Sequence, residues 1–275
     1  MTTLITWISY SDTGQSPHLP RAVYVASDSR ITWGSASSRW EAGRKIFTPI
    51  KEPHIFGYCG DVVFPSLVLG QIISAIDYGI LFPTEATAEE KNSIIFESIK
   101  SSHKLRHNTP EYDFKILHIH RTQNWPSTAF AAWVICYIAE TNTWDCSQVL
   151  LPTTTGIALM LGSGAKITKI QADKWAKSDV GGTSRAIFSA FCDAVTSGGD
   201  PRSGGTPQIS ALYTKDSPRP LGYVENGRTF LHGLQLAPCE TLANIEWRDR
   251  LFQRIEPHTL SRIQSARMFV NPHLG

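Results

Sequence analysis

The sequence predicts an α+β fold in which antiparallel sheets carry helices on their outer faces. Its β-type segments and helical patterns come in separate runs, in the order strands, two helices, strands, two helices and strands. Segregated runs of this kind favour antiparallel sheets over alternating βαβ units. Neither an internal repeat nor a low-complexity linker interrupts the 275 residues. We therefore expect a single domain over 1–275, with a core at about 2–235 and a C-terminal extension at about 236–275.

Strands are expected where β-branched and aromatic residues cluster or alternate with polar ones. The segments that meet this description are 2–8, 21–30, 55–61, 114–120, 130–140, 156–162 and 208–214. The first two are expected to pair as a hairpin across the turn-rich segment 9–20, and another hairpin is expected around Gly227. The segment 2–8 becomes apolar almost at once, although chain ends are usually frayed, which indicates that the start of the chain is held in a sheet.

Helices are expected where apolar residues recur with a spacing of three and four. This spacing is found at 61–80, 86–106, 164–176 and 183–197. The second of these helices is expected to begin near Thr87, because Glu89 and Glu90 then occupy its first turn, where negative charge is favoured. From about residue 236 the chain turns charged and helical in character, without a clear packing partner.

The composition is that of an ordinary globular protein and excludes several function classes. Hydrophobic residues make up 41% of the chain, and the formal net charge is +2. A charge so close to neutral offers no electrostatic footprint for nucleic acid or an acidic membrane, so neither is an expected partner. No secretory signal is recognisable, and no apolar stretch reaches the roughly 20 residues of a bilayer span. The five scattered cysteines form no CxxC pair, which favours reduced thiols and a cytoplasmic location.

A threonine at a free N-terminus carries its own base. Thr2 becomes the first residue if Met1 is removed, and a small second residue is of the kind that methionine aminopeptidases accept. The α-amino group then has a pKa of about 7.7–8.0, against about 10.4 for a lysine side chain. Enough of it is uncharged at neutral pH to accept the hydroxyl proton, which makes Thr2 a candidate nucleophile.

Such a nucleophile needs a nearby cation, an anion that holds the cation, and backbone N–H groups for the oxyanion. The sequence offers Lys45 in GRKIF, Asp28 in ASDSR and the amide of Gly60 in GYCGD. Each signal is weak alone, because a single Asp or Lys is usually a surface residue. Their order along the chain is what makes the set informative.

Six short motifs carry a resemblance to a known family. They are TTL at 2–4, VASDSRIT at 25–32, GRKIF at 43–47, GYCGD at 57–61, GSG at 162–164 and DPRSGG at 200–205. In this order and spacing they resemble the proteasome β-subunit superfamily of N-terminal-nucleophile (Ntn) hydrolases, which includes the bacterial peptidase HslV. The resemblance covers residues 2 to about 215. Any one motif alone would mean little.

The resemblance implies a role for each matching residue. Thr2 would be the nucleophile and, through its amine, the general base, beside an Asp28–Lys45 ion pair. The other implied catalytic-site residues are Gly60 in the oxyanion hole and Ser163, Asp200 and Ser203, hydrogen-bonded around the amine and hydroxyl. Arg30 would support the SDSR turn.

Substrate contacts are implied at five positions, which are Ile31, Thr32, Gly43, Tyr58 and Val62. The backbone of Thr32, with that of Gly60, would bind an extended peptide by β-strand addition. The other four would line the pocket for the residue before the scissile bond. An apolar wall with a tyrosine favours small or medium uncharged side chains.

The family's fold is a four-layer αββα sandwich, two antiparallel sheets flanked by helices. The implied activity is that of a threonine peptidase, forming an acyl-enzyme ester with no cofactor and no metal. The implied substrate is a peptide or unfolded protein, and the implied assembly is a homo-oligomer, a ring or another form, with a separate ATPase unfoldase as an optional partner. Three segments depart from the family pattern, namely 9–20, 107–150 and 220–275. They are longer than usual, so a double-ring barrel is not implied.

Other interpretations of the same residues stay open. A catalytically silent scaffold or ring subunit would keep Asp28 and Lys45 as a structural pair, and a non-peptidase Ntn amidase would share the nucleophile. Cys59 could be proposed as a nucleophile, but no histidine is near it in sequence and a buried thiol is favoured. His118 and His120 would share a strand face, yet two histidines without a third ligand only weakly indicate a metal site. GSGAK at 162–166 lacks the spacing of a phosphate-binding loop.

Overall fold

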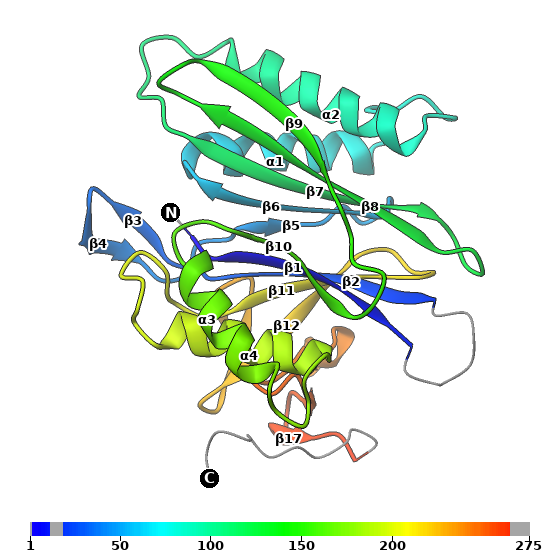
Figure 1. The fold of residues 1–275 in the computed structure, drawn as a ribbon, viewed down its shortest axis with the longest axis vertical. Coiled ribbons are helices and arrows are strands. Elements are labelled where there is room, and N and C mark those ends of the chain that lie inside the picture. Colours follow the sequence, from blue (N-terminus) through cyan, green and yellow to red (C-terminus); the bar gives the residue numbers. More distant parts are fainter. Residues whose placement is uncertain (1, 12–18, 265–275) are drawn as a thin grey trace.

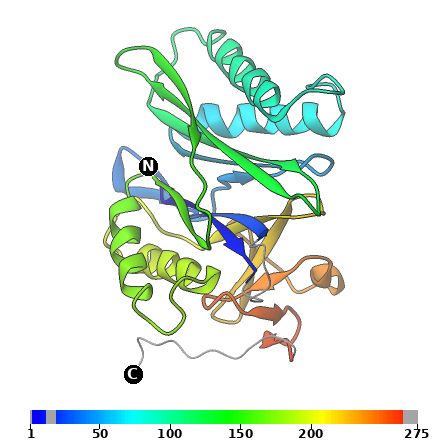
Figure 2. The ribbon, with the colours of Figure 1, turned by 45° about the vertical axis from the view of Figure 1, so that its right-hand side comes forward.

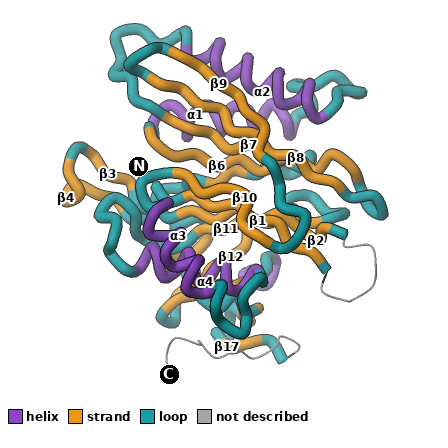
Figure 3. Tube along the Cα trace, viewed as in Figure 1, coloured by secondary structure: helices purple, strands orange, loops and turns teal. Residues whose placement is uncertain are grey.

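Two β-sheets face each other across an apolar layer, and helices cover the outer face of each sheet (Figure 1). The structure, a computed structural model, describes residues 2–11 and 19–264. Coloured by secondary structure, the strands occupy the middle of the molecule and the helices lie at either side of them (Figure 3). The fold is therefore mixed α+β, as the segregated runs in the sequence predicted.

The larger sheet has ten strands in the part of the chain that is described. They are β1 (Leu4–Tyr10), β2 (Pro20–Ser27), β10 (Gly156–Leu161), β11 (Gln208–Tyr213), β12 (Arg219–Glu225), β13 (Arg228–Leu231), β14 (Leu234–Leu236), β15 (Trp247–Arg248), β16 (Arg254–Glu256) and β17 (Ser261–Arg262). Their order is β10-β1-β2-β11-β12-β15-β16-β17, and β13 and β14 branch from β12. Every pairing is antiparallel except that of β12 with β15.

The smaller sheet is an antiparallel meander. Its strands, in spatial order, are β5 (Ile46–Phe47), β6 (His54–Gly60), β7 (Phe114–Gln123), β8 (Ala129–Ile138) and β9 (Thr143–Val149). A separate hairpin of β3 (Ile31–Trp33) and β4 (Ser35–Trp40) projects near the start of the chain (Figure 1). Neither this hairpin nor β9 is predicted from the sequence, because these segments are rich in polar residues and carry few apolar ones.

The four α-helices of the described residues match the expected segments. They are α1 (Val63–Asp77), α2 (Ala88–His103), α3 (Ala165–Trp175) and α4 (Ser184–Thr196). The predicted start of α2 is confirmed by a capping box: the Thr87 hydroxyl accepts a hydrogen bond from Glu90 N (3.2 Å), and the Glu90 carboxylate accepts one from Thr87 N (2.8 Å). Among the described residues, no helix is both long and apolar enough to cross a bilayer.

Strand β1 shows why the start of the chain is apolar on both faces. Leu4 and Ile8 point into the layer between the two sheets, where they meet the apolar side chains of β6 and β7. Ile5 and Trp7 point the other way, into the cluster formed with α4. Because a strand alternates its side chains, burial of both faces requires nearly continuous apolar sequence.

The part of the C-terminal segment up to residue 264 differs from the expected helical character, and 265–275 lie outside the described residues. It forms a short 3₁₀ helix, η1 (Glu240–Asn244), followed by the short strands β15, β16 and β17 at the end of the molecule away from α1 and α2 (Figures 1 and 2). Trp247 is 1% exposed and packs against Gly222, and Phe252 joins the cluster under α4. Strands of two or three residues have no detectable period, so tertiary packing rather than local pattern decides this region.

A buried polar network lies on the helix-facing side of the smaller sheet. His118 contacts His54 (2.9 Å between ring nitrogens) and Asn92 of α2 (2.9 Å), while His54 also contacts Glu52 (3.3 Å). The ring of His120 stacks on His54 with centroids 4.3 Å apart. Burial lowers the pKa of His54 and His118, and it lowers the pKa of His120 to about 3. His118 and His120 are thus buried residues of this polar network.

We expect these histidines to make the protein sensitive to acid. A histidine whose folded pKa is depressed binds its proton only after unfolding, so the unfolding free energy falls as pH drops below about 6.5, by roughly 1 kcal/mol per pH unit for each such group. The His120→Phe variant should therefore lose about 1–2 kcal/mol less between pH 7 and pH 5 than the parent protein, measured by urea unfolding. The exposed His107→Phe is the control and should lose as much as the parent. Equal losses in all three proteins would contradict the expectation.

Candidate active site

The start of the chain is fixed by the strands on either side of β1. Leu4 lies opposite Ser27 of β2 and opposite Leu161 of β10. One residue earlier, the carbonyl of Thr3 accepts hydrogen bonds from Asp28 N (3.2 Å) and from the Ser27 hydroxyl (3.1 Å). Thr2 and Thr3 are therefore held between the ends of two neighbouring strands, where both are buried.

The GSG loop after β10 fits closely against these two residues. Gly162 has φ +87°, and a Cβ there would lie 1.8 Å from the carbonyl oxygen of Thr2. A Cβ at Gly164 would lie 1.8 Å from the hydroxyl of Thr3, and Gly164 N approaches the Thr2 carbonyl at 3.5 Å. Both glycines are required because the backbone of the chain start occupies the space of their side chains.

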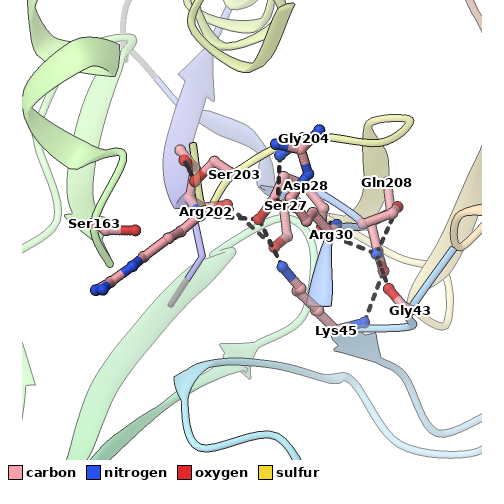
Figure 4. A network of polar contacts seen from close by, with 12 residues as sticks. Ser27, Asp28, Arg30, Gly43, Lys45, Ser163, Arg202, Ser203, Gly204 and Gln208 are labelled. Atoms are coloured by element: carbon pink, nitrogen blue, oxygen red, sulfur yellow. Dashed lines mark hydrogen bonds and ion pairs between the residues drawn. The ribbon is translucent and has the colours of Figure 1, made fainter. Parts of the chain in front are cut away.

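Asp28 is the centre of the site (Figure 4). Its Oδ1 accepts hydrogen bonds from the Lys45 ammonium (2.8 Å) and from Thr3 N (2.9 Å). Its Oδ2 accepts from Gly204 N (2.9 Å) and Arg30 N (3.1 Å). Because the Lys45 ammonium and the Thr3 amide share one carboxylate oxygen, the cation lies within two hydrogen bonds of the Thr2–Thr3 peptide.

The Asp28–Lys45 pair is completely excluded from solvent. Both side chains are 0% exposed. Burial lowers the pKa of Lys45, and the adjacent Asp28 carboxylate opposes this effect by favouring the charged ammonium. An ammonium in such surroundings acts over a short distance with little screening, so it can favour the neutral form of a nearby amine and the anionic form of a nearby hydroxyl.

A second chain of hydrogen bonds connects the loop 200–204 with the GSG loop. The Thr3 hydroxyl donates to Ser203 Oγ (2.7 Å), which donates to Asp200 (2.7 Å), and Ser163 Oγ donates to the same Asp200 oxygen (2.6 Å). Burial acts to raise the pKa of Asp200, but the hydrogen bonds from Ser163 and Ser203 outweigh it and leave the pKa below its usual value. The structure thus brings together Asp28, Lys45, Ser163, Asp200 and Ser203 around the chain start.

Gln208 belongs to the site although no motif in the sequence points to it. Its Oε1 accepts a hydrogen bond from Lys45 N (2.9 Å), and its Nε2 donates to the carbonyl of Gly43 (2.7 Å) and that of Asp28 (3.2 Å) (Figure 4). The amide therefore clamps the segment that carries Lys45 to the segment that carries Asp28. A glutamine at the start of a strand gives no sequence signal, because its function depends wholly on tertiary neighbours.

Arg30 holds the loop 200–204 in place. Its guanidinium pairs with Glu41 (2.9 Å) and donates to the carbonyl of Pro201 (2.9 Å). A Cβ at Gly204 would lie 2.4 Å from the Arg30 guanidinium carbon, so the loop lies directly against this side chain. These contacts are those of a supporting residue rather than of a reacting group.

Gly60 ends strand β6 beside the GSG loop. It has φ +98°, and a Cβ there would lie 2.3 Å from the carbonyl oxygen of Asp113. Glycine is therefore required by the close approach of β7, independently of any function. Gly60 and Ser163 nevertheless line one common cavity, which places the Gly60 backbone at the edge of the site.

Three of the five expected substrate-contact residues lie together. Ile31 is 4% exposed on β3, and a Cβ at Gly43 would lie 2.2 Å from its side chain. Thr32 follows on β3, half-buried, and its buried hydroxyl has no hydrogen-bond partner among the residues that the structure describes. This group borders the Asp28–Lys45 side of the site, because Gly43 N donates to the carbonyl of Ser29 (2.8 Å).

Tyr58 and Val62 lie in a different environment from the one that the sequence suggests. In β6, His54, Phe56 and Tyr58 share the face that packs against the helices, and Tyr58 is 0% exposed. The half-buried Val62 packs on the same cluster. The Tyr58 ring therefore faces the core under α1 and presents no open wall, because the alternation along β6 turns it away from the space between the sheets.

The other candidate groups show no separate chemistry. Cys59 is buried between the sheets, and burial raises the pKa of its thiol, which makes it a poor nucleophile. Over residues 2–11 and 19–264, no three His, Cys, Asp or Glu side chains are grouped as metal ligands.

We expect Lys45→Met to destabilise the protein by about 3–5 kcal/mol, because it leaves the Asp28 carboxylate buried without its cation. The double variant Asp28→Asn/Lys45→Met should lose less than the sum of the two single variants, since the pair is then removed together. Urea unfolding of all three variants measures this coupling. The exposed pair Lys169–Asp173 supplies the matched cycle and should show a coupling below about 1 kcal/mol. Equal coupling in the two cycles would contradict the expected importance of the buried pair.

Comparisons with known proteins find likeness in structure. No family model matches the sequence, and no curated protein matches it. Among solved structures, the chain is similar to eukaryotic HslV from Trypanosoma brucei, at 13% sequence identity and a TM-score of 0.46. The match covers 76% of this chain and 99% of that one. The candidate site consequently rests on its own contacts.

Proposed function

We propose that the protein is an N-terminal-nucleophile hydrolase of the threonine-peptidase type, with Thr2 as its nucleophile once Met1 is removed. The observation that carries the proposal is the shared Asp28 oxygen, which accepts hydrogen bonds from both the Thr3 amide and the Lys45 ammonium. A buried cation beside the start of the chain is what an N-terminal threonine needs to become reactive. The ordered motifs in the sequence support the same assignment.

In the proposed reaction the Thr2 hydroxyl attacks the carbonyl carbon of the scissile bond. A new Oγ–C bond forms, and the hydroxyl proton passes to the α-amine, whose basic form the nearby Lys45 ammonium favours. The oxyanion of the tetrahedral intermediate is stabilised by the backbone N–H of Gly60. Collapse of the intermediate breaks the C–N bond, and the leaving amine takes the proton. Water then attacks the ester carbon while its proton passes to the α-amine; the C–Oγ bond breaks, the carboxylic acid product leaves, and the amine returns the proton to the Thr2 hydroxyl.

The proposed architecture is the four-layer αββα sandwich of this superfamily. Its support is the arrangement of α1 and α2 on the smaller sheet and of α3 and α4 on the larger one. A peptide substrate would be bound in extended form along the backbone of Thr32 and Gly60. The proposed role of Ser163, Asp200 and Ser203 is to hold the amine and the hydroxyl in their reactive orientation.

The test is hydrolysis of a panel of fluorogenic peptides by the protein with Met1 removed. Thr2→Ala should abolish turnover, lowering kcat/KM by at least about a thousandfold, because it removes the nucleophilic hydroxyl and leaves only the α-amine. Thr2→Ser keeps both groups and should retain measurable activity. Thr3→Ala is the matched control: it removes the neighbouring hydroxyl, and a loss as large as that of Thr2→Ala would contradict the assignment.

Two other functions are distinguished by the same panel. Hydrolysis of small amides, but of no peptide, would indicate a non-peptidase amidase with the same nucleophile. Absence of turnover in a protein shown to begin at Thr2 would indicate the catalytically silent scaffold instead. In that case the Asp28–Lys45 pair would have only a structural role.

A further inference from the structure

A cavity of about 470 Å³ opens beside the site on the β10 side. Gly162 and Ser163 of the GSG loop form one wall, and Gly60 forms part of the rim. The rest is built by the ends of β6, β7 and β8, including Cys59, Lys115 and Cys136. The cavity is therefore continuous with the proposed catalytic site through Gly60, and none of Ile31, Thr32, Gly43, Tyr58 and Val62 lines it.

Lys115 is the cation of this cavity. It is directly opposite Cys59 on β6 and directly opposite Cys136 on β8, so the three side chains form a row on the face that looks toward the larger sheet. The row continues to Asp145 on β9, and Asp113 also lines the cavity, with its carboxylate accepting a hydrogen bond from Ala139 N (2.8 Å). Among the described residues, no carboxylate lies within 4 Å of the Lys115 ammonium.

The position of the cavity fixes which part of a substrate can reach it. Strand β1 lies between β2 and β10. The residues expected to contact the acyl side of a substrate, Ile31 and Gly43, lie against each other and beside Ser29, just after the end of β2, whereas the cavity is lined by Gly162 and Ser163, just after the end of β10. A peptide whose acyl part lies over the β2 side must therefore direct its leaving group toward the β10 side.

We propose that this cavity binds the leaving-group part of the substrate and that Lys115 selects for a carboxylate there. The carboxylate is supplied by an acidic side chain or by the C-terminus of a short peptide. Lys115 itself is exposed, and apart from Asp113 the cavity is lined mainly by apolar and thiol-bearing residues, so a carboxylate entering it meets a cation that has no carboxylate partner among the described residues. The inference rests on the proposed function, because it assigns a subsite of the same reaction.

The first test compares two internally quenched peptides that differ only by Asp or Asn after the cleaved bond. The parent protein should cleave the Asp peptide about three- to fivefold faster in kcat/KM, as expected for one partly exposed ion pair. Lys115→Met should reduce this ratio to about one, and Lys115→Glu should reverse it. Lys166→Met removes an exposed lysine three residues after Ser163 that does not line the cavity, and it should keep the parent ratio. A parent ratio of one, or an unchanged ratio in Lys115→Met, would overturn the proposal.

The second test needs no hydrolysis. In the Thr2→Ala variant, the half-buried Cys136 is alkylated with iodoacetamide in the presence of the Asp or the Asn peptide, and modification is measured by mass spectrometry of digested protein. The Asp peptide should slow alkylation of Cys136, and the Asn peptide should not. The exposed Cys239 should react at the same rate with either peptide. If the Asp peptide protects Cys136 from alkylation and this protection disappears in Lys115→Met, the result supports carboxylate binding in the cavity even if no substrate is ever cleaved. Turnover without any selective protection would leave the proposed hydrolase standing and contradict this subsite.

Discussion

The buried ion pair between Asp28 and Lys45 is the interaction on which the rest of the candidate site depends. One carboxylate joins the chain start, the segment before β5 and the loop that carries Gly204. Two charges without solvent cost several kcal/mol each to bury, and an apolar pair would hold these segments together at least as well. The chain keeps a charged pair where its own start passes, which argues for a chemical purpose rather than a purely structural one.

The smaller sheet separates two buried polar networks of different character. On the face toward the larger sheet, the Lys45 ammonium is buried against an acceptor and remains paired. On the face toward α2, His54 and His118 are kept neutral because burial lowers their pKa. Only the first network touches the chain start, so only it can influence an N-terminal nucleophile. The second is expected to contribute to stability and its pH dependence.

The sequence predicts most of the regular core and little of its periphery. Strands such as β1 and helices such as α2 have long patterns or a capping box, and these local signals survive in the fold. The β3–β4 hairpin and the short C-terminal strands lack such signals, because their conformation is set by packing. For the site, the motif order suggests Asp28 and Lys45, yet the Thr3–Ser203 bond joins residues 200 positions apart and Gln208 acts only through its neighbours. The orientation of Tyr58 likewise depends on which face of β6 meets the helices.

The most direct test of the central claim is the intact mass of the purified protein before and after incubation with a β-lactone that acylates N-terminal threonines. We expect a chain that lacks Met1 and gains one adduct, with no adduct on Thr2→Ala. Such a result would establish that Thr2 is both exposed by processing and activated by its surroundings. A chain that begins at Thr2 and gains no adduct would contradict the account, because the Asp28–Lys45 pair would then fail to activate the residue beside it.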